Sequence, residues 1–460
     1  MNIKNIFILF LIVLILNHCN APVCLAFWFD NDKSAPTDFS YKFDYINIDW
    51  WENFNDPILK SYILRAVESN QDLKVATLKT EEYRQFVKMT FGQELPELSM
   101  GSNFTAFKIP FSNDRSLNIS DSGYVLPFTV KYEADLLRKN NDKTKSAKKQ
   151  HEASKFQEKA AYIAICSYVA TVYLNIVKND KLIAIQSELS AIKKEQLRRM
   201  VFRYSQGLAS VMQVNIYEGN YKTSKNDLDN LIKSRDVMLN ELAVLIGESP
   251  ECSQNLKRAN LDEIEFIGEV PDCIPSDVIF SRPDVLSSEA QLQASQIDVR
   301  VARKELLPTF NINGNLGFNT FTTDPFFSWS GTYALLSAGL TQTLFAGGRR
   351  IANLRIKKNS YDQLFETYKQ TSLKAVQEVN DSLCTIKFDN SIDAENINKL
   401  ILEEDNFARS SRKYQNGVIS CPELLNEKEN LIYVKNQQVQ SKTARLVNYL
   451  GLYKAAGGQV

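Results

Sequence analysis

Few residues of this sequence could do chemistry, and they do not form a catalytic pattern. The chain has 460 residues but only two histidines. His18 lies in an N-terminal segment that we expect to be removed, and His151 stands between Lys149 and Lys155, which favours a solvated surface position. No nucleophile, general base or phosphate-binding loop appears with supporting context. We therefore expect a protein that is not an enzyme and that has no cofactor and no metal site.

Glu423 is a carboxylate just past the second predicted helix turn. It lies three residues before Asn426 at the start of a predicted helix, so the two share one face. Gln213 holds the corresponding place in the first half of the chain. If copies of the chain surround an axis, these residues would line a narrow opening, where carboxylates attract cations. The alternative is that Glu423 only complements the positive end of the helix dipole.

The N-terminus has the pattern of a secretory signal. Lys4 precedes an apolar run of eleven residues, 6–16, which is too short to span a bilayer. We expect residues 1–26 to be removed by cleavage after Ala26. The alternative is a lipoprotein signal, in which Cys19 is lipidated. No later run looks long and apolar enough for a transmembrane helix.

Export would place the other cysteines in an oxidising compartment. Cys252 and Cys273 flank a proline-bearing connection and could form a disulfide bond. Cys166 and Cys384 lie in long helical patterns, where we expect them to pack as small hydrophobic side chains. Lys plus Arg equals Asp plus Glu, at 54 each, so no global charge directs the chain to nucleic acid or anionic lipid.

Two long runs without glycine or proline organise the chain. In residues 349–416, apolar or small residues recur at steps of three and four, as in a helix that packs on another helix: Phe365, Tyr368, Ser372, Ala375, Val379, Leu383 and Ile386. Residues 134–205 have the same character. A helix of either length would reach roughly 100 Å, which predicts a rod or a long barrel of helices.

The chain also repeats itself. Asn70-Gln-Asp-Leu leads to Leu95-Pro96, and Arg282-Pro-Asp-Val leads to Leu307-Pro308 about 212 residues later, which predicts two tandem structural repeats. We expect a first repeat at 27–250 (a helix, strands 98–109 and 123–132, long helix 134–205, return helix 210–246), a connecting segment at 251–281, and a second repeat at 282–460 (a helix, strands 309–321 and 331–345, long helix 349–416, return helix 421–456). The fold class is mainly α, with long helical hairpins and four strands. Such an open sheet would leave its edges unsatisfied in lipid, so other copies of the chain must close it.

Four motifs carry a family resemblance. They are Trp50-Trp-Glu-Asn-Phe-Asn-Asp-Pro57, Tyr132-Glu-Ala-Asp-Leu136, Arg282-Pro-Asp284 and Leu344-Phe-Ala-Gly-Gly-Arg349. With them the chain resembles the TolC-type outer-membrane efflux proteins, in the branch that serves resistance-nodulation-division pumps. The resemblance implies a homotrimer in the outer membrane, in which twelve strands close one β-barrel and an α-barrel extends through the periplasm. A non-channel periplasmic coiled-coil scaffold is the alternative function.

The resemblance also implies partners and roles for particular residues. The protein would be the exit duct of a tripartite efflux or secretion system, with a periplasmic adaptor, an inner-membrane transporter and outer-membrane lipid as partners. The turns that end the long helices would face the adaptor through Tyr204, Gly207, Leu208, Tyr414, Gly417 and Val418, although a structural turn needs only the glycine. Members of this family commonly have acidic residues at both gate positions, so Asn426 is a departure and implies a weaker acidic ring.

Overall fold

The computed structural model describes residues 45, 47–110, 118–271, 273–319, 329 and 331–458. The predicted signal segment at 1–26 and the lipidation site at Cys19 lie outside these residues. By its contacts the chain divides into two units, Met1–Ile46 and Asn47–Val460. The description below concerns the second unit.

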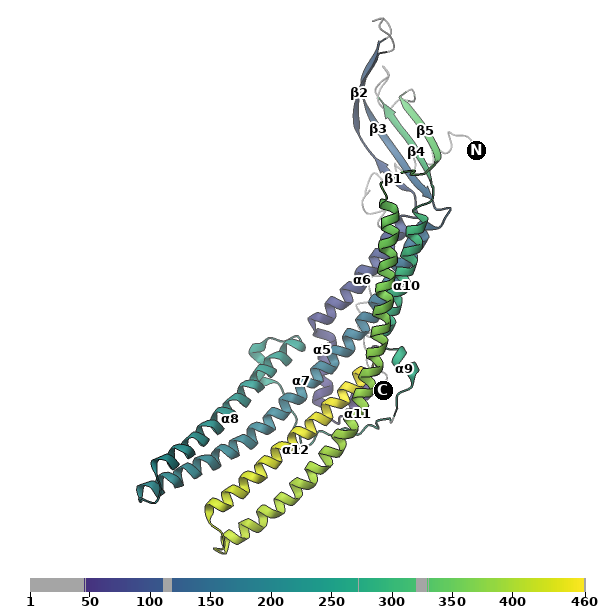
Figure 1. The fold of residues 1–460 in the computed structure, drawn as a ribbon. Coiled ribbons are helices and arrows are strands. Elements are labelled where there is room, and N and C mark those ends of the chain that lie inside the picture. Colours follow the sequence, from purple (N-terminus) through teal and green to yellow (C-terminus); the bar gives the residue numbers. More distant parts are fainter. Residues whose placement is uncertain are drawn as a thin grey trace. The chain divides into compact units, whose positions relative to one another are not determined.

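The helices of this unit fall into two similar series (Figure 1). The first contains α4 (Ile48–Glu52), α5 (Pro57–Ser69), α6 (Gln71–Gly92), α7 (Lys139–Ser205) and α8 (Val211–Leu245). The second contains α9 (Ser276–Phe280), α10 (Pro283–Lys304), α11 (Arg349–Gln415) and α12 (Cys421–Ala455). A short 3-10 helix, Pro250–Asn255, follows α8. In each series a long helix and a shorter return helix form an antiparallel hairpin.

The first long helix begins five residues later than the predicted residue 134. Strand β3 continues through Ala134, and Asp135 then accepts hydrogen bonds from the backbone N–H groups of Lys139 (2.6 Å) and Asn141 (2.8 Å). This carboxylate satisfies donors that the first turn of a helix otherwise leaves free. The start of α7 is therefore fixed by Asp135.

The structure contains five strands where the sequence predicts four: β1 (Glu97–Met100), β2 (Asn103–Pro110), β3 (Asn118–Ala134), β4 (Thr309–Asn319) and β5 (Thr332–Thr341). β1 and β2 both pair with β3 in one register, since Met100 faces Phe128 and Asn103 faces Val125. Between these pairs the Gly101 N–H donates to the Pro127 carbonyl at 3.0 Å, but proline has no N–H to return the bond. Pro127 thus divides one predicted strand into two.

The strands form one antiparallel sheet in the order β1/β2, β3, β4, β5. Along β4, apolar Phe310, Ile312, Leu316 and Phe318 alternate with asparagines at 311, 313, 315 and 319. The register places Leu126 and Phe128 of β3, and Ala338 and Leu340 of β5, on the apolar face. The sheet therefore has one apolar face and one face rich in amides and hydroxyls.

The helices next to the sheet lie side by side in the order α6, α7, α10, α11, while α8 packs on α7 and α12 packs on both α11 and α7 (Figure 1). Among the described helices, α7 alone is long and apolar enough to cross a membrane by length and composition, contrary to the prediction that no such run exists. Most of its apolar window, 61%, is buried inside the protein. That composition is explained by packing against five neighbouring helices, α5, α6, α8, α10 and α12.

Residues 256–266, in the segment between the two repeats, form a strap that crosses the helices. Leu256, Leu261 and Ile264 are buried. The Tyr62 hydroxyl donates to the Lys257 carbonyl (2.8 Å), the Ala259 N–H donates to the Tyr173 hydroxyl (3.1 Å), and the Lys442 ammonium donates to the Asp262 carbonyl (3.2 Å). These contacts reach α5, α7 and α12. The strap therefore ties elements of both repeats together.

Candidate functional site: the hairpin tips, the seam between them and the sheet junction

The first hairpin tip is a glycine-ended turn followed by a capped helix. Gly207 has a φ of +73° and its N–H donates to the Tyr204 carbonyl (2.9 Å), while the Leu208 N–H donates to the Arg203 carbonyl (2.8 Å). Ser210 and Gln213 then form a reciprocal capping box at the start of α8, in which Gln213 Oε1 accepts from the Ser210 N–H at 2.9 Å. Side-chain and backbone bonds together give the turn one defined shape.

The second tip repeats this geometry. Gly417 has a φ of +71°, and the N–H groups of Gly417 and Val418 donate to the carbonyls of Tyr414 (3.0 Å) and Lys413 (2.9 Å). In the capping box of α12, Glu423 Oε2 accepts from the Ser420 N–H at 2.6 Å. Glu423 and Gln213 therefore occupy equivalent positions, and they differ in charge.

The tips expose the apolar side chains that the sequence analysis named. Leu208 and Val418 are 68% and 70% exposed, and Tyr204 and Tyr414 are also exposed. Sequence reasoning missed three more exposed residues at the start of α8, which enlarge the apolar surface of the first tip: Val211, Met212 and Ile216. In the sequence these residues are marked by the apolar pair Val211-Met212, which directly follows the capping residue Ser210. Exposed apolar groups on a rigid turn are suited to binding another protein.

Glu423 is held as a helix cap, and its hydrogen bonds set its charge. The bond from the Ser420 backbone N–H is the main cause of a lowered Glu423 pKa, so the carboxylate is ionised at neutral pH. Asn426 is exposed one turn later, and its Oδ1 lies 3.5 Å from Gln196 Nε2 on α7. Glu423 therefore caps α12, and the cap leaves the carboxylate exposed.

Polar contacts join the two hairpins along α7 and α12. Glu429 on α12 accepts from Lys193 (2.6 Å) and from Gln196 (2.6 Å), and Lys428 pairs with Glu188 (2.7 Å). Lys193 and Glu429 are only about one-fifth exposed, so this pair is less screened than a surface pair. The sequence gives no direct signal for this seam, because it depends on the relative register of α7 and α12.

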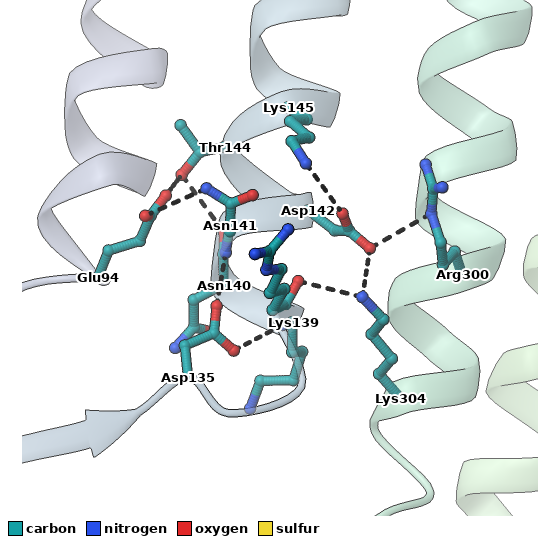
Figure 2. Close-up of polar contacts among 11 residues, drawn as sticks. Glu94, Asp135, Lys139, Asn140, Asn141, Asp142, Thr144, Lys145, Arg300 and Lys304 are labelled. Carbon is teal, nitrogen blue, oxygen red and sulfur yellow. Dashed lines mark hydrogen bonds and ion pairs between the residues drawn. The ribbon is translucent and has the colours of Figure 1, made fainter.

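A second polar cluster lies where the strands meet the helices (Figure 2). Asp142 near the start of α7 is buried, and its carboxylate lies 2.6 Å from Lys304 Nζ, 3.2 Å from Arg300 Nε and 3.8 Å from Lys145 Nζ. Glu94, after α6, accepts from Thr144 Oγ1. These carboxylates connect the ends of α6 and α10 to the start of α7.

The cysteines depart from prediction at two places. Cys252 and Cys273 are free and exposed, so the predicted disulfide between them is not present. The strap is anchored by its buried apolar residues instead. Cys384 is exposed, not packed, because it lies on a face of α11 that meets no other helix of the chain, whereas Cys166 is buried as predicted. Within the described ranges, no group of three or more His, Cys, Asp or Glu could hold a metal ion.

Comparison with known proteins adds evidence of family and fold. The family model described as outer membrane efflux protein matches residues 63–248 and 274–458. The chain is 27% identical over 444 residues to the pyoverdine export outer membrane protein OpmQ of Pseudomonas aeruginosa, covering 93% of this chain and 92% of that one. It is 22% identical to the cation efflux system protein CusC of Escherichia coli K12, covering 90% of each. The structure of the Campylobacter jejuni CmeC outer membrane channel is similar with a TM-score of 0.80 and 20% identity, covering 90% of this chain and 88% of that one.

Proposed function

The chain belongs to the outer membrane efflux protein family, and we propose that three copies form the exit duct of a tripartite efflux system. It is an outer-membrane channel with a mainly helical fold, as the resemblance implies. In the proposed trimer each chain contributes four strand positions, since β1 and β2 share one, and three chains would give a closed barrel of about twelve strands. The helical hairpins would continue the duct into the periplasm.

The observation that carries this proposal is the two-faced sheet with unpaired edges. Within the described strands, β1/β2 and β5 each have a neighbour on one side only. Backbone groups at such edges cannot be left unsatisfied in hydrocarbon. Joining β5 of one chain to β1/β2 of the next removes every edge, places the apolar face toward lipid and turns the asparagine face toward the lumen.

The helices support the same arrangement. α6 and α11 are the outer members of the row α6, α7, α10, α11, and both expose large apolar side chains, including Leu78 and Met89 on α6 and Ile356 and Phe388 on α11. Contact between α11 of one chain and α6 of the next would cover these groups. A solitary coiled-coil scaffold would need no two-faced sheet, so this alternative is set aside.

We propose that the duct has no catalytic activity and that the transporter upstream selects the substrate. A lumen lined by asparagine amides offers hydrogen bonds but little shape selection. The names of relatives refer to pyoverdine, antibiotics, toluene and cations, which fits a duct that serves different pumps. The partners would be a periplasmic adaptor and an inner-membrane transporter.

The adaptor would dock on the two tips. We predict that Gly207→Trp and Gly417→Trp abolish export while the trimer remains in the outer membrane, because the bulky ring covers the turn. Gly219→Trp is the matched control, since its position on α8 is also open and its backbone is helical. Gly207→Ala separates the causes, because it imposes the left-handed strain without the bulk. Unimpaired export by both tryptophan variants would show that the adaptor does not dock there.

Glu423 would line the narrow end of the duct, with Asn426 and Gln213 completing the ring. Because Glu423 would be the ring's one carboxylate per chain, we predict weak block of single-channel conductance by a trivalent cation in planar bilayers. Glu423→Gln should remove this block and keep the cap, since Gln213 caps α8 in the same way. Block that persists unchanged in Glu423→Gln would place the carboxylate outside the lumen.

A further inference from the structure

Two short connections, which we call elbows, join the sheet to the long helices. The first elbow, residues 134–139, joins β3 to α7, and the second, residues 342–350, joins β5 to α11. β3 and β5 are both antiparallel to β4, so they run in the same direction and end at the same edge of the sheet. The two elbows therefore lie at one level, at the edge where the sheet gives way to the helices (Figure 1).

Both elbows expose a pair of large apolar side chains. Leu136 and Leu137 are 72% and 41% exposed in the first, and Leu344 and Phe345 are 93% and 88% exposed in the second. Neighbouring residues Phe310 and Leu340 face each other on the apolar face of the sheet. The elbows thus continue the apolar face of the sheet to the edge at which the sheet ends.

Arginines follow each apolar pair directly. Arg138 follows Leu137, and Arg349 and Arg350 come four and five residues after Phe345. Across the part of the chain that the structure describes, the side chains of these three arginines have no hydrogen-bond or ion-pair partner. The nearby lysines differ, since Lys139 pairs with Glu133 (2.5 Å) and Lys304 pairs with Asp142. No carboxylate occurs from residue 342 to residue 361, although this stretch contains five cations: Arg349, Arg350, Arg355, Lys357 and Lys358.

Arg138 also holds a backbone conformation that suits glycine. Its φ is +54° at the N-cap of α7, and Gly348 holds the same position before α11 with a φ of +77°. A left-handed residue with a long side chain is strained where glycine is not. An arginine at this position, with no side-chain partner among the described residues, is consistent with a ligand outside the chain.

A cavity of about 190 Å³ lies beside the first elbow. Its lining combines apolar Leu137, Phe310 and Leu340 with two lysines, Lys139 and Lys304, and two carboxylates, Glu133 and Asp135. The apolar part of the lining suits an acyl chain at the edge of a bilayer, whereas the charges of the lining balance. Among the described residues of the elbows, the cations without an intramolecular partner are therefore the three arginines, and the neutral net charge of the whole chain conceals the excess of cations at the start of α11.

We propose that the elbows bind anionic phospholipids of the leaflet that faces the periplasm. The acyl chains lie against the leucines and Phe345, and Arg138, Arg349 and Arg350 bind the phosphate and the negative headgroup. Charge complementarity selects an anionic headgroup over a zwitterionic one. The inference rests on the sheet lying in the outer membrane, and it adds a lipid site to the channel.

The test is native mass spectrometry of the full-chain protein in mild detergent, titrated with phosphatidylglycerol or phosphatidylethanolamine. We expect phosphatidylglycerol to bind several-fold more tightly. The triple variant Arg138→Gln, Arg349→Gln, Arg350→Gln should lose this several-fold preference for phosphatidylglycerol and keep its phosphatidylethanolamine affinity, because it lacks the three cations that would face the negative headgroup. The corresponding lysine variant should bind as the native protein does.

The control replaces three exposed arginines near the tips, Arg198, Arg409 and Arg412, with glutamine, and it should leave lipid binding unchanged. If the triple variant does not assemble, which the same spectra report, Arg138→Gly removes one cation and should lower the preference two- to threefold. Excess glycerol phosphate should not displace the lipid. Equal affinity for both lipids, a preference that survives the glutamine variant, or full displacement by glycerol phosphate would each overturn the proposal, the last by showing a site for soluble anions.

Discussion

The two long helices, α7 and α11, have the same length and the same place in their repeats, yet they have different surroundings. Buried residues occur along most of α7, from Asn140 to Ile192, because α6, α8, α10 and α12 pack around it. In α11 the buried residues are Ala375, Val379, Ile386 and Asp393. The two repeats therefore share the same order of helices, but their long helices have different neighbours. α7 is the internal helix of one chain, whereas α11 packs on α10 and α12 and leaves its outer side uncovered by the described helices.

The largest effect is expected from placing charges on the exposed side of α11. Phe388 and Ile392 are four residues apart on one face, and both are exposed. We expect the double variant Phe388→Glu, Ile392→Glu to abolish the trimer, because buried unpaired carboxylates would be too costly at the interface. Mass measurement in detergent reports the number of chains. Asn398→Glu on the same helix is the control, and a trimeric double variant would show that this face stays in solvent.

A smaller effect is expected from the Asp142 cluster, which has no counterpart at the start of α11. Asp142→Asn removes the buried carboxylate that faces Lys304, Arg300 and Lys145 (Figure 2). We expect a loss of about 2–3 kcal/mol in the free energy of unfolding, since a buried charge cluster loses one partner. Asp405→Asn breaks the exposed pair with Arg409 and should cost at most about 0.5 kcal/mol. Thermal unfolding measures both, and equal shifts would contradict the difference in burial.

The smallest predicted effect compares the two tips by pH. Hydrogen bonds from Ser420 depress the pKa of Glu423 in the folded state, so its contribution to the start of α12 is present above the unfolded pKa. That contribution is lost as the pH falls through the folded pKa. Gln213 does not titrate. Hydrogen exchange, corrected for intrinsic rates, should accelerate in the first turn of α12, and not in that of α8, as the pH falls through the lowered pKa of Glu423. Glu423→Gln should remove the difference, and acceleration in both tips would refute the assignment.

The spacing of apolar residues and the positions of glycine and proline made most of the fold predictable. In the helical seam Ala375 and Val379 are buried against Val285 and Ala455, Ile386 is also buried, and the glycine turns lie where Gly207 and Gly417 indicate. These features are local, so spacing within one segment determines them. The division of the first strand also has a local signal, because Pro127 has no N–H to donate to a neighbouring strand.

The contacts that join the hairpins and the sheet could not be predicted in the same way. The pairing of Glu429 with Lys193 depends on how far α12 slides along α7, and the pairing of Asp142 with Lys304 joins residues 162 positions apart. Charged residues are frequent on both helices, so composition does not choose among the possible registers. Tertiary packing decides them, and the sequence pattern leaves packing open.

The chain closes on itself at the short helix α4. Trp50 stacks on Tyr453 with ring centroids 4.3 Å apart, and the Asn47 N–H donates to the Tyr453 hydroxyl at 3.2 Å, across 406 residues of sequence. Phe266 of the strap joins the same aromatic cluster. This cluster is therefore completed only when α12 docks beside α4. Until then Trp50 and Trp51 lack part of their cover, and exposed aromatic groups favour aggregation and proteolysis, so the position of Tyr453 couples the docking of α12 to the protection of both tryptophans.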